Sequence, residues 1–172
     1  MQVDSILKAL ESTAIGTTIS EHESLFPWIE SVHVLAIVLV VGSIATVDLR
    51  LLGWGSRDRP LDRLLRDVLP WTWTAFLIAF CSGSLLFVSK AVTYGHNFFF
   101  LSKMALLAIA GLNMALFHVF TSRDIARWGM TPATTPLAAR IAGGVSLCLW
   151  ITIVAFGRWI GFTLQHVMPA AG

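Results

Sequence analysis

Residues 34–47 read VLAIVLVVGSIATV, fourteen positions without a charged side chain. With weaker flanks, this apolar run extends over about residues 27–52. Three further runs of the same kind cover about residues 71–92, 98–120 and 138–165. Each run offers on the order of 20 or more residues, enough for a helix across a hydrocarbon layer of roughly 30 Å. The sequence therefore predicts an all-α integral membrane protein, a four-helix bundle.

Composition favours one membrane domain over the whole chain, residues 1–172. Hydrophobic residues make up 56% and charged residues only 13%, about half the charged share of a soluble domain. The formal net charge of +2, without a basic tract, argues against a nucleic-acid partner. The two cysteines, Cys81 and Cys148, lie in apolar runs and lack the spacing of a zinc or redox pair. We interpret both as small packing residues.

The polar residues 1–26 predict an interfacial segment that precedes the first span. Val3, Ile6, Leu7 and Leu10 recur at helical spacing among charged residues, which is typical of an amphipathic helix at a membrane surface. Arginines gather in the connections after the first and third spans: Arg50, Arg57, Arg59, Arg63 and Arg66, then Arg123, Arg127 and Arg140. The positive-inside rule places these connections in the cytoplasm of a bacterial inner membrane, with both termini on the outer side.

The connection after the first span has two further features. Leu61, Leu64, Leu65 and Val68 alternate with charged residues and predict an interfacial helical stretch that leads into Pro70. At the end of the first span, Arg50 is expected to be solvated or interfacial, and Asp48 to pair with a residue of another helix.

His33 and His118 lie inside predicted spans and are the strongest functional signal of the chain. An ionisable side chain is costly in a bilayer, so its default interpretation is functional. Neutral imidazole is a common ligand of haem iron and of other transition metals. Proton handling and a polar contact between helices are the alternatives. Glu30 shares a helix face with His33, three residues away, and is expected to orient the imidazole.

Three other polar residues in the spans are candidates for a cofactor site. Lys103 and Arg158 lie near the outer ends of the third and fourth spans. Both are candidate partners of haem propionates, because Arg and Lys pair with carboxylates; Lys103 has snorkelling to the membrane surface as its alternative. Asn113 is expected to form a hydrogen bond between helices, with a cofactor contact as the alternative.

The two span histidines are predicted to lie at different depths. His33 is about six residues inside the outer end of its span and His118 about twenty, a difference of roughly 20 Å at 1.5 Å per residue. The pair is therefore not expected to hold one haem within one chain. His96, in the connection before the third span, is an alternative partner of His33 for a haem or a copper ion, and Met104 is another.

The chain also resembles a known group of proteins. The resemblance rests on FPWIESVHVL at residues 26–35, DLRLLG at 48–53, GRWIGF at 157–162, and Phe100 with Lys103. These match a group of small bacterial four-helix membrane proteins over about residues 26–162. That group looks distantly similar to the membrane domain of copper-resistance D proteins and to four-helix b-type cytochromes. The resemblance implies haem b or copper as the cofactor and His33 as a ligand.

Together these observations predict a haem b-binding membrane protein that transfers electrons across the bilayer or within its outer leaflet. A quinol or an outer redox protein would then be its partner, and an oxidoreductase activity is open. A copper-binding or copper-transporting membrane protein and a structural membrane subunit without a cofactor are the alternatives. Glycines in the spans favour a homo-oligomer within the lipid bilayer.

Overall fold

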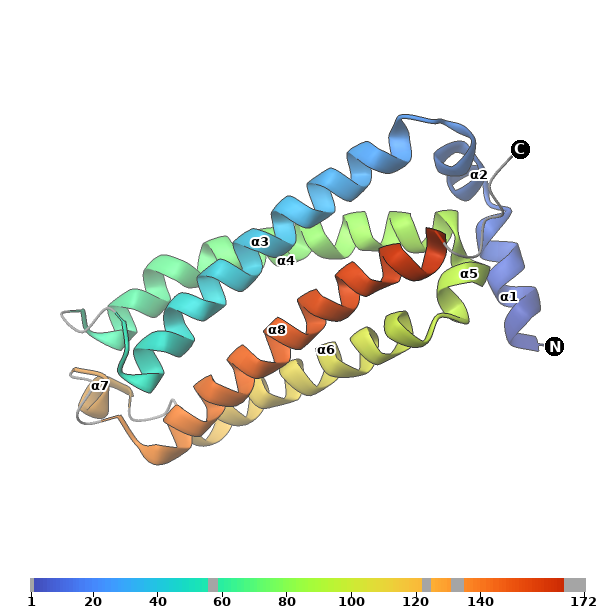
Figure 1. Cartoon of the computed structure of the whole chain (residues 1–172). Helices are drawn as coiled ribbons and strands as arrows, with labels where there is room; N and C mark the ends of the chain where they lie inside the picture. Colours follow the sequence, from blue (N-terminus) through green and yellow to red (C-terminus); the bar gives the residue numbers. More distant parts are fainter. Residues whose placement is uncertain (1, 56–58, 122–124, 131–134, 166–172) are drawn as a thin grey trace.

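The computed structural model describes residues 2–55, 59–121, 125–130 and 135–165, which are almost entirely helical. Four helices are long and apolar enough to cross a membrane: α3 (Leu25–Leu52), α4 (Leu61–Ser89), α6 (Phe98–Leu116) with the π-helical turn η1 (Phe117–Thr121), and α8 (Leu137–Gln165). Four shorter helices lie at the two ends of these spans: α1 (Gln2–Glu11), α2 (Ala14–Glu21), α5 (Ala91–Gly95) and α7 (Ile125–Trp128). The predicted all-α class with four spans is confirmed (Figure 1).

The four spans pack in the order α4, α3, α8 and α6, with α3 and α8 at the centre of the series. Helices α4 and α6 meet near one end, where the rings of Phe87 and Phe100 stack with their centroids 5.3 Å apart. Large apolar side chains such as Leu39, Phe80 and Ile151 remain exposed on the outside of the bundle. This distribution suits helices surrounded by lipid, because the outward-facing apolar residues then contact an apolar solvent.

One end of the bundle, which we call the terminal end, is formed by α1, α2, α5 and the ends of α4 and α8 (Figure 1). Side chains of the N-terminal helices hold it together. The Ser20 hydroxyl donates a 2.6 Å hydrogen bond to the carbonyl of Ser89, the last residue of α4. The backbone N–H of Val92 in α5 donates to the Glu11 carboxylate at 3.0 Å. The N-terminal segment is therefore bonded to the span ends.

The predicted amphipathic helix is present as α1. Leu7 is buried against α5, where a Cβ built on Gly95 would lie 2.6 Å from a Leu7 methyl carbon. Val3 and Ile6 stay exposed. One part of the apolar face of α1 therefore packs on α5, and another part faces outward.

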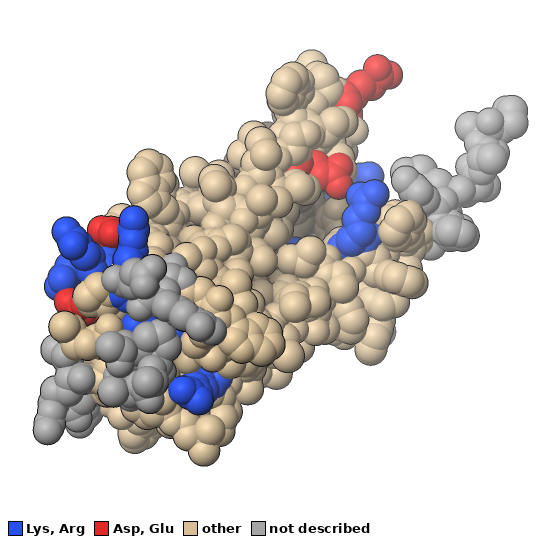
Figure 2. All heavy atoms as spheres, turned by 60° about the vertical axis from the view of Figure 1, so that its left-hand side comes forward, with Lys and Arg blue, Asp and Glu red and all other residues tan. Residues whose placement is uncertain are grey.

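The opposite end, which we call the basic end, is where α3 ends, α4 begins and α7 lies (Figure 1). Basic side chains, blue in Figure 2, gather at this end. The side chains of Arg57, Arg123 and Arg127 lie outside the described part of the chain. Both α1 and the last turns of α8 lie at the terminal end, opposite the end where α3 ends and α4 begins.

Arg50 at the basic end was expected to be solvated or interfacial, and the solvated alternative is wrong. Its side chain is 0% exposed. The Nε group donates to the carbonyl of Arg59 at 3.2 Å, and Nη2 donates to the carbonyl of Gly129 at 3.1 Å. The chain can close over the guanidinium because Gly53 ends α3 in the left-handed conformation, with φ 84°.

The second span also begins earlier than predicted, at Leu61 instead of about residue 71. The stretch expected to lie at the interface continues without a break through Pro70 into α4. Leu61 and Leu64 are buried in a cluster that includes Leu51 and Phe117. The free energy gained by burying these leucines offsets the cost of the one backbone hydrogen bond that a proline removes from a helix.

Candidate functional site

His33 lies on α3 and turns its ring toward α4. Its Nδ1 atom is 3.0 Å from the hydroxyl oxygen of Ser82. The same hydroxyl donates its hydrogen to the carbonyl of Ile78 at 2.6 Å. Because a hydroxyl carries one hydrogen, Ser82 accepts the hydrogen bond and His33 Nδ1 donates it. In the neutral imidazole this arrangement leaves Nε2 with a free lone pair, which is the form that binds metal ions.

A glycine makes room for the His33 ring. A Cβ built on Gly83 would lie 2.8 Å from His33 Cε1 and 3.3 Å from Nδ1, closer than such carbon atoms approach in proteins. The imidazole therefore packs directly on the backbone of α4. Ser82 and Gly83 are adjacent residues, so one turn of α4 supplies both the hydrogen-bond acceptor and the space.

Lys103 brings a positive charge to the same part of the bundle. Its half-buried side chain extends from α6 toward α8, where a Cβ built on Gly157 would lie 3.6 Å from the ammonium nitrogen. Lys103 is close enough to His33 for the two side chains to interact electrostatically. The ion pairs found among the described residues do not involve Lys103. We call the set His33, Ser82, Gly83, Lys103 and Gly157 the histidine site; it draws on all four spans.

Glu30 was expected to orient His33, but Ser82 forms the hydrogen bond to Nδ1. The carboxylate of Glu30 is exposed and acts on Tyr94 in α5. Burial, with a contribution from the Glu30 charge, raises the pKa of Tyr94 to about 12. The Tyr94 ring packs on Phe100, with centroids 5.4 Å apart. Sequence reasoning missed Tyr94, although it is the single tyrosine of the chain.

Three other predicted residues lie apart from these contacts. Arg158 is exposed, and its guanidinium carbon lies 5.3 Å from the centroid of the Phe162 ring, in a cation–π contact. Met104 is 50% exposed. His96 is exposed, with Nε2 2.9 Å from the Asp4 carboxylate of α1. Within the described ranges, His, Cys, Asp and Glu side chains form no group of three or more suited to a metal ion.

His118 has different surroundings from His33. It lies in η1, toward the basic end, and its ring is exposed on the outside of the bundle. Its Nδ1 donates to the carbonyl of Met114, one turn earlier in the same chain segment, at 3.1 Å. The Phe117 ring lies edge-on at 5.8 Å. The prediction that the two span histidines lie at different depths is confirmed.

Two polar residues join α8 to its neighbours. Asn113 on α6 donates to the carbonyl of Ala142 at 3.1 Å, which confirms its predicted role between helices. Asp48 on α3 is 5% exposed and has Ser146 of α8 as its partner, as predicted, while its Oδ2 atom is buried without a hydrogen-bond partner. These residues hold the bundle together. The two cysteines, expected to pack, are exposed thiols on the outer surface.

The length and hydropathy of its four spans define the class of this protein as a multi-pass membrane protein. Residues 12–163 match the profile of a family described as "Family of unknown function (DUF6644)", and the chain belongs to that family. No curated protein and no solved structure matches the chain. The resemblance to copper-resistance D membrane domains and b-type cytochromes thus stays a prediction.

Proposed function

We propose that this chain is a haem b-binding membrane protein in which His33 would hold the haem iron through Nε2. The observation that supports this proposal best is the hydrogen bond from His33 Nδ1 to Ser82. Ligating histidines usually donate the other ring N–H to a fixed acceptor, which sets the tautomer and the orientation of the ring. Ser82 supplies that acceptor from a neighbouring span.

Two further features near His33 support haem binding. Lys103 would neutralise a propionate, because it carries a positive charge near His33 and forms none of the ion pairs found among the described residues. Gly83 and Gly157 leave bare backbone beside the ring and the ammonium group. A bound haem would supply one-electron redox chemistry. The chain would fix the ligand, balance the charge and keep water away.

The donor set favours a single histidine ligand. His118 lies toward the opposite end of the bundle, and His96 is bonded to Asp4. Among the described residues, no three His, Cys, Asp or Glu side chains are grouped so that they could hold a copper ion. Haem iron needs only one protein ligand, as in globins and peroxidases. This difference in required donors is why haem is proposed ahead of copper.

The orientation in the membrane, the redox partner and the oligomeric state are part of the same proposal. Positive-inside asymmetry supports a basic end in the cytoplasm of a bacterial inner membrane, which would put the histidine site in the outer half of the bilayer. A quinol or an outer redox protein would then exchange electrons with the haem. Gly42, Gly111 and Gly161 have open space where a Cβ would stand, which leaves surfaces on three spans for close contact in a homo-oligomer.

The test is a visible absorption spectrum of the full chain purified in detergent and loaded with haem. The proposal expects a Soret band that appears on haem loading and shifts on reduction, as for haem held by one histidine. His33→Ala should lower haem content at least about tenfold, in the range seen for disrupted metal-site shells. His118→Ala is the matched control and should keep it.

Two outcomes would overturn the proposal. One is a colourless protein of full helicity after haem loading. The other is a haem-containing protein in which His118→Ala, and not His33→Ala, removes the bound haem. Metal analysis of the same preparations distinguishes the alternatives, because stoichiometric copper lost with His33→Ala would favour the copper-binding function.

A further inference from the structure

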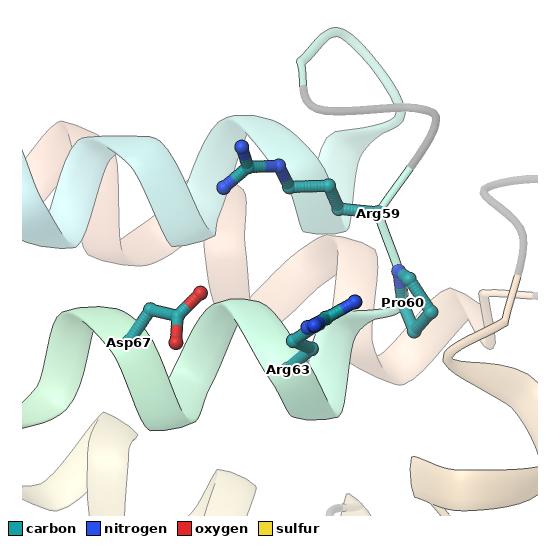
Figure 3. Close-up of a pocket in the computed structure, with 4 residues that line it drawn as sticks. All are labelled: Arg59, Pro60, Arg63 and Asp67. Carbon is teal, nitrogen blue, oxygen red and sulfur yellow. The ribbon is translucent and has the colours of Figure 1, made fainter.

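A second candidate site lies at the basic end, at the opposite end of the bundle from the N-terminal helices. A cavity of about 340 Å³ is lined by Arg59, Pro60, Arg63 and Asp67 (Figure 3). Arg59 reaches over α4 from the preceding connection, while Arg63 and Asp67 rise from successive turns of α4. The volume falls in the range of small-molecule sites, roughly 300–1,000 Å³.

The backbone beneath this cavity is held by hydrogen bonds. The buried Arg50 guanidinium donates to the carbonyl of Arg59. The next residues are Pro60, whose ring limits its backbone, and Leu61, whose N–H donates to the carbonyl of Gly129 at 2.9 Å. Arg59 therefore stands on a fixed stretch of chain, which lowers the entropy lost when its side chain binds a ligand.

The charges around the cavity are unequal. Arg66, on the same helix, is bonded to Asp62 at 2.8 Å. The ion pairs found among the described residues include neither Arg59 nor Arg63. The lining side chains thus comprise two guanidinium groups and one carboxylate, a balance of +1. A ligand with a single negative charge would neutralise this balance.

We propose that this cavity binds the phosphate group of an anionic phospholipid of the phosphatidylglycerol type. Guanidinium groups bind phosphate oxygens through paired hydrogen bonds. The cavity lies where membrane-spanning helices end, at the level where lipid phosphates are found, and basic pockets in that position bind anionic headgroups. The Asp67 carboxylate would accept hydrogen bonds from the hydroxyls of a glycerol headgroup. This proposal is independent of the haem proposal.

The test is native mass spectrometry of the full chain in detergent, with equal amounts of phosphatidylglycerol, phosphatidylethanolamine and phosphatidylcholine of matched acyl chains. Phosphatidylglycerol should be retained preferentially. Arg59→Ala and Arg63→Ala should each weaken its binding about fivefold, the effect of one interfacial basic residue. Arg66→Ala is the matched control and should leave binding nearly unchanged. Thermal unfolding of each variant verifies folding.

Four results would contradict the proposal. An equal loss with Arg66→Ala would mean a diffuse surface charge and no built site. Equal retention of the three lipids would remove the preference for an anion. Preferential retention of phosphatidylethanolamine would mean a zwitterion site formed with Asp67. Displacement of the lipid by millimolar inorganic phosphate, with phosphate bound in its place, would identify free phosphate as the ligand.

Discussion

The two ends of the bundle treat their polar groups in opposite ways. At the basic end, Nε and Nη2 of the buried Arg50 donate to backbone carbonyls of two connections, so the arginine serves the fold, while Nη1 is buried without a hydrogen-bond partner. Toward the terminal end, one ring nitrogen of His33 lies outside the hydrogen bond to Ser82, and Lys103 forms none of the ion pairs found among the described residues. The difference teaches that the partners of a buried polar group say more than its burial: backbone carbonyls of two connections indicate a role in the fold, and a side chain that orients an imidazole indicates a ligand.

The largest effect is expected for Arg50→Met, which tests the structural half of this comparison. Loss of the guanidinium leaves the carbonyls of Arg59 and Gly129 without these donors and should lower the free energy of unfolding by about 3 kcal/mol. Denaturant titration in detergent measures this change. The exposed Arg66→Met should change it by less than about 0.5 kcal/mol. An equal effect of both variants would mean that Arg50 does not hold the connections.

Gly83→Ala tests the packing of the histidine site. The added methyl group would press on the His33 ring and should cost about 2 kcal/mol of stability while displacing the imidazole. Gly42→Ala is the control, because nothing lies within 4 Å of its Cβ position. Denaturant titration and haem content after loading measure the two effects. Wild-type values for Gly83→Ala in both assays would contradict the close contact.

Ser82→Ala isolates the hydrogen bond that orients His33. Its loss should cost about 1 kcal/mol, which is roughly a fivefold weaker affinity for haem. Ser84→Ala removes an exposed hydroxyl of the same helix that donates only to its own backbone, and it should leave affinity unchanged. Haem titration followed at the Soret band gives both affinities. If Ser82→Ala bound haem as tightly as the wild type, the orienting role of Ser82 would be wrong.

The smallest effect concerns Tyr94 at the terminal end. Because Tyr94 is the single tyrosine, ultraviolet absorbance at high pH reports its ionisation alone. The midpoint should be about 12 in the folded chain, above the ordinary tyrosine pKa near 10. The folded state holds this proton more tightly than the unfolded state, so stability should fall as pH rises from about 10 to about 12. A midpoint near 10 would mean that Tyr94 is solvated.

Much of the fold could be predicted because apolar runs in the sequence mark the segments that lie inside a membrane. The four runs gave the number of spans, and their residue numbers placed His33 and His118 at different levels. The start of α4 could not be predicted, since the burial of Leu61 and Leu64 depends on Leu51 and residues of other elements. Periodicity marked those leucines as one face but did not identify what covers that face.

The candidate site was predicted only in part. His33 and Lys103 were identified, because an ionisable residue in an apolar run is unusual whatever surrounds it. Ser82 and Gly83 were not identified as site residues, because serine and glycine are common in membrane helices and carry no signal of their own. Arg50 was expected in a solvated or interfacial position, since sequence cannot show that distant carbonyls close over a guanidinium.

The sequence by itself determined the class of the protein, its four spans and the level of each polar residue along them. That follows from the constant rise of a helix, which converts residue number into depth. Only the tertiary structure decided which way each helix faces and which side chains meet. Rotation about a helix axis depends on packing with neighbours, and this rotation holds His33 against Ser82 while His118 faces outward.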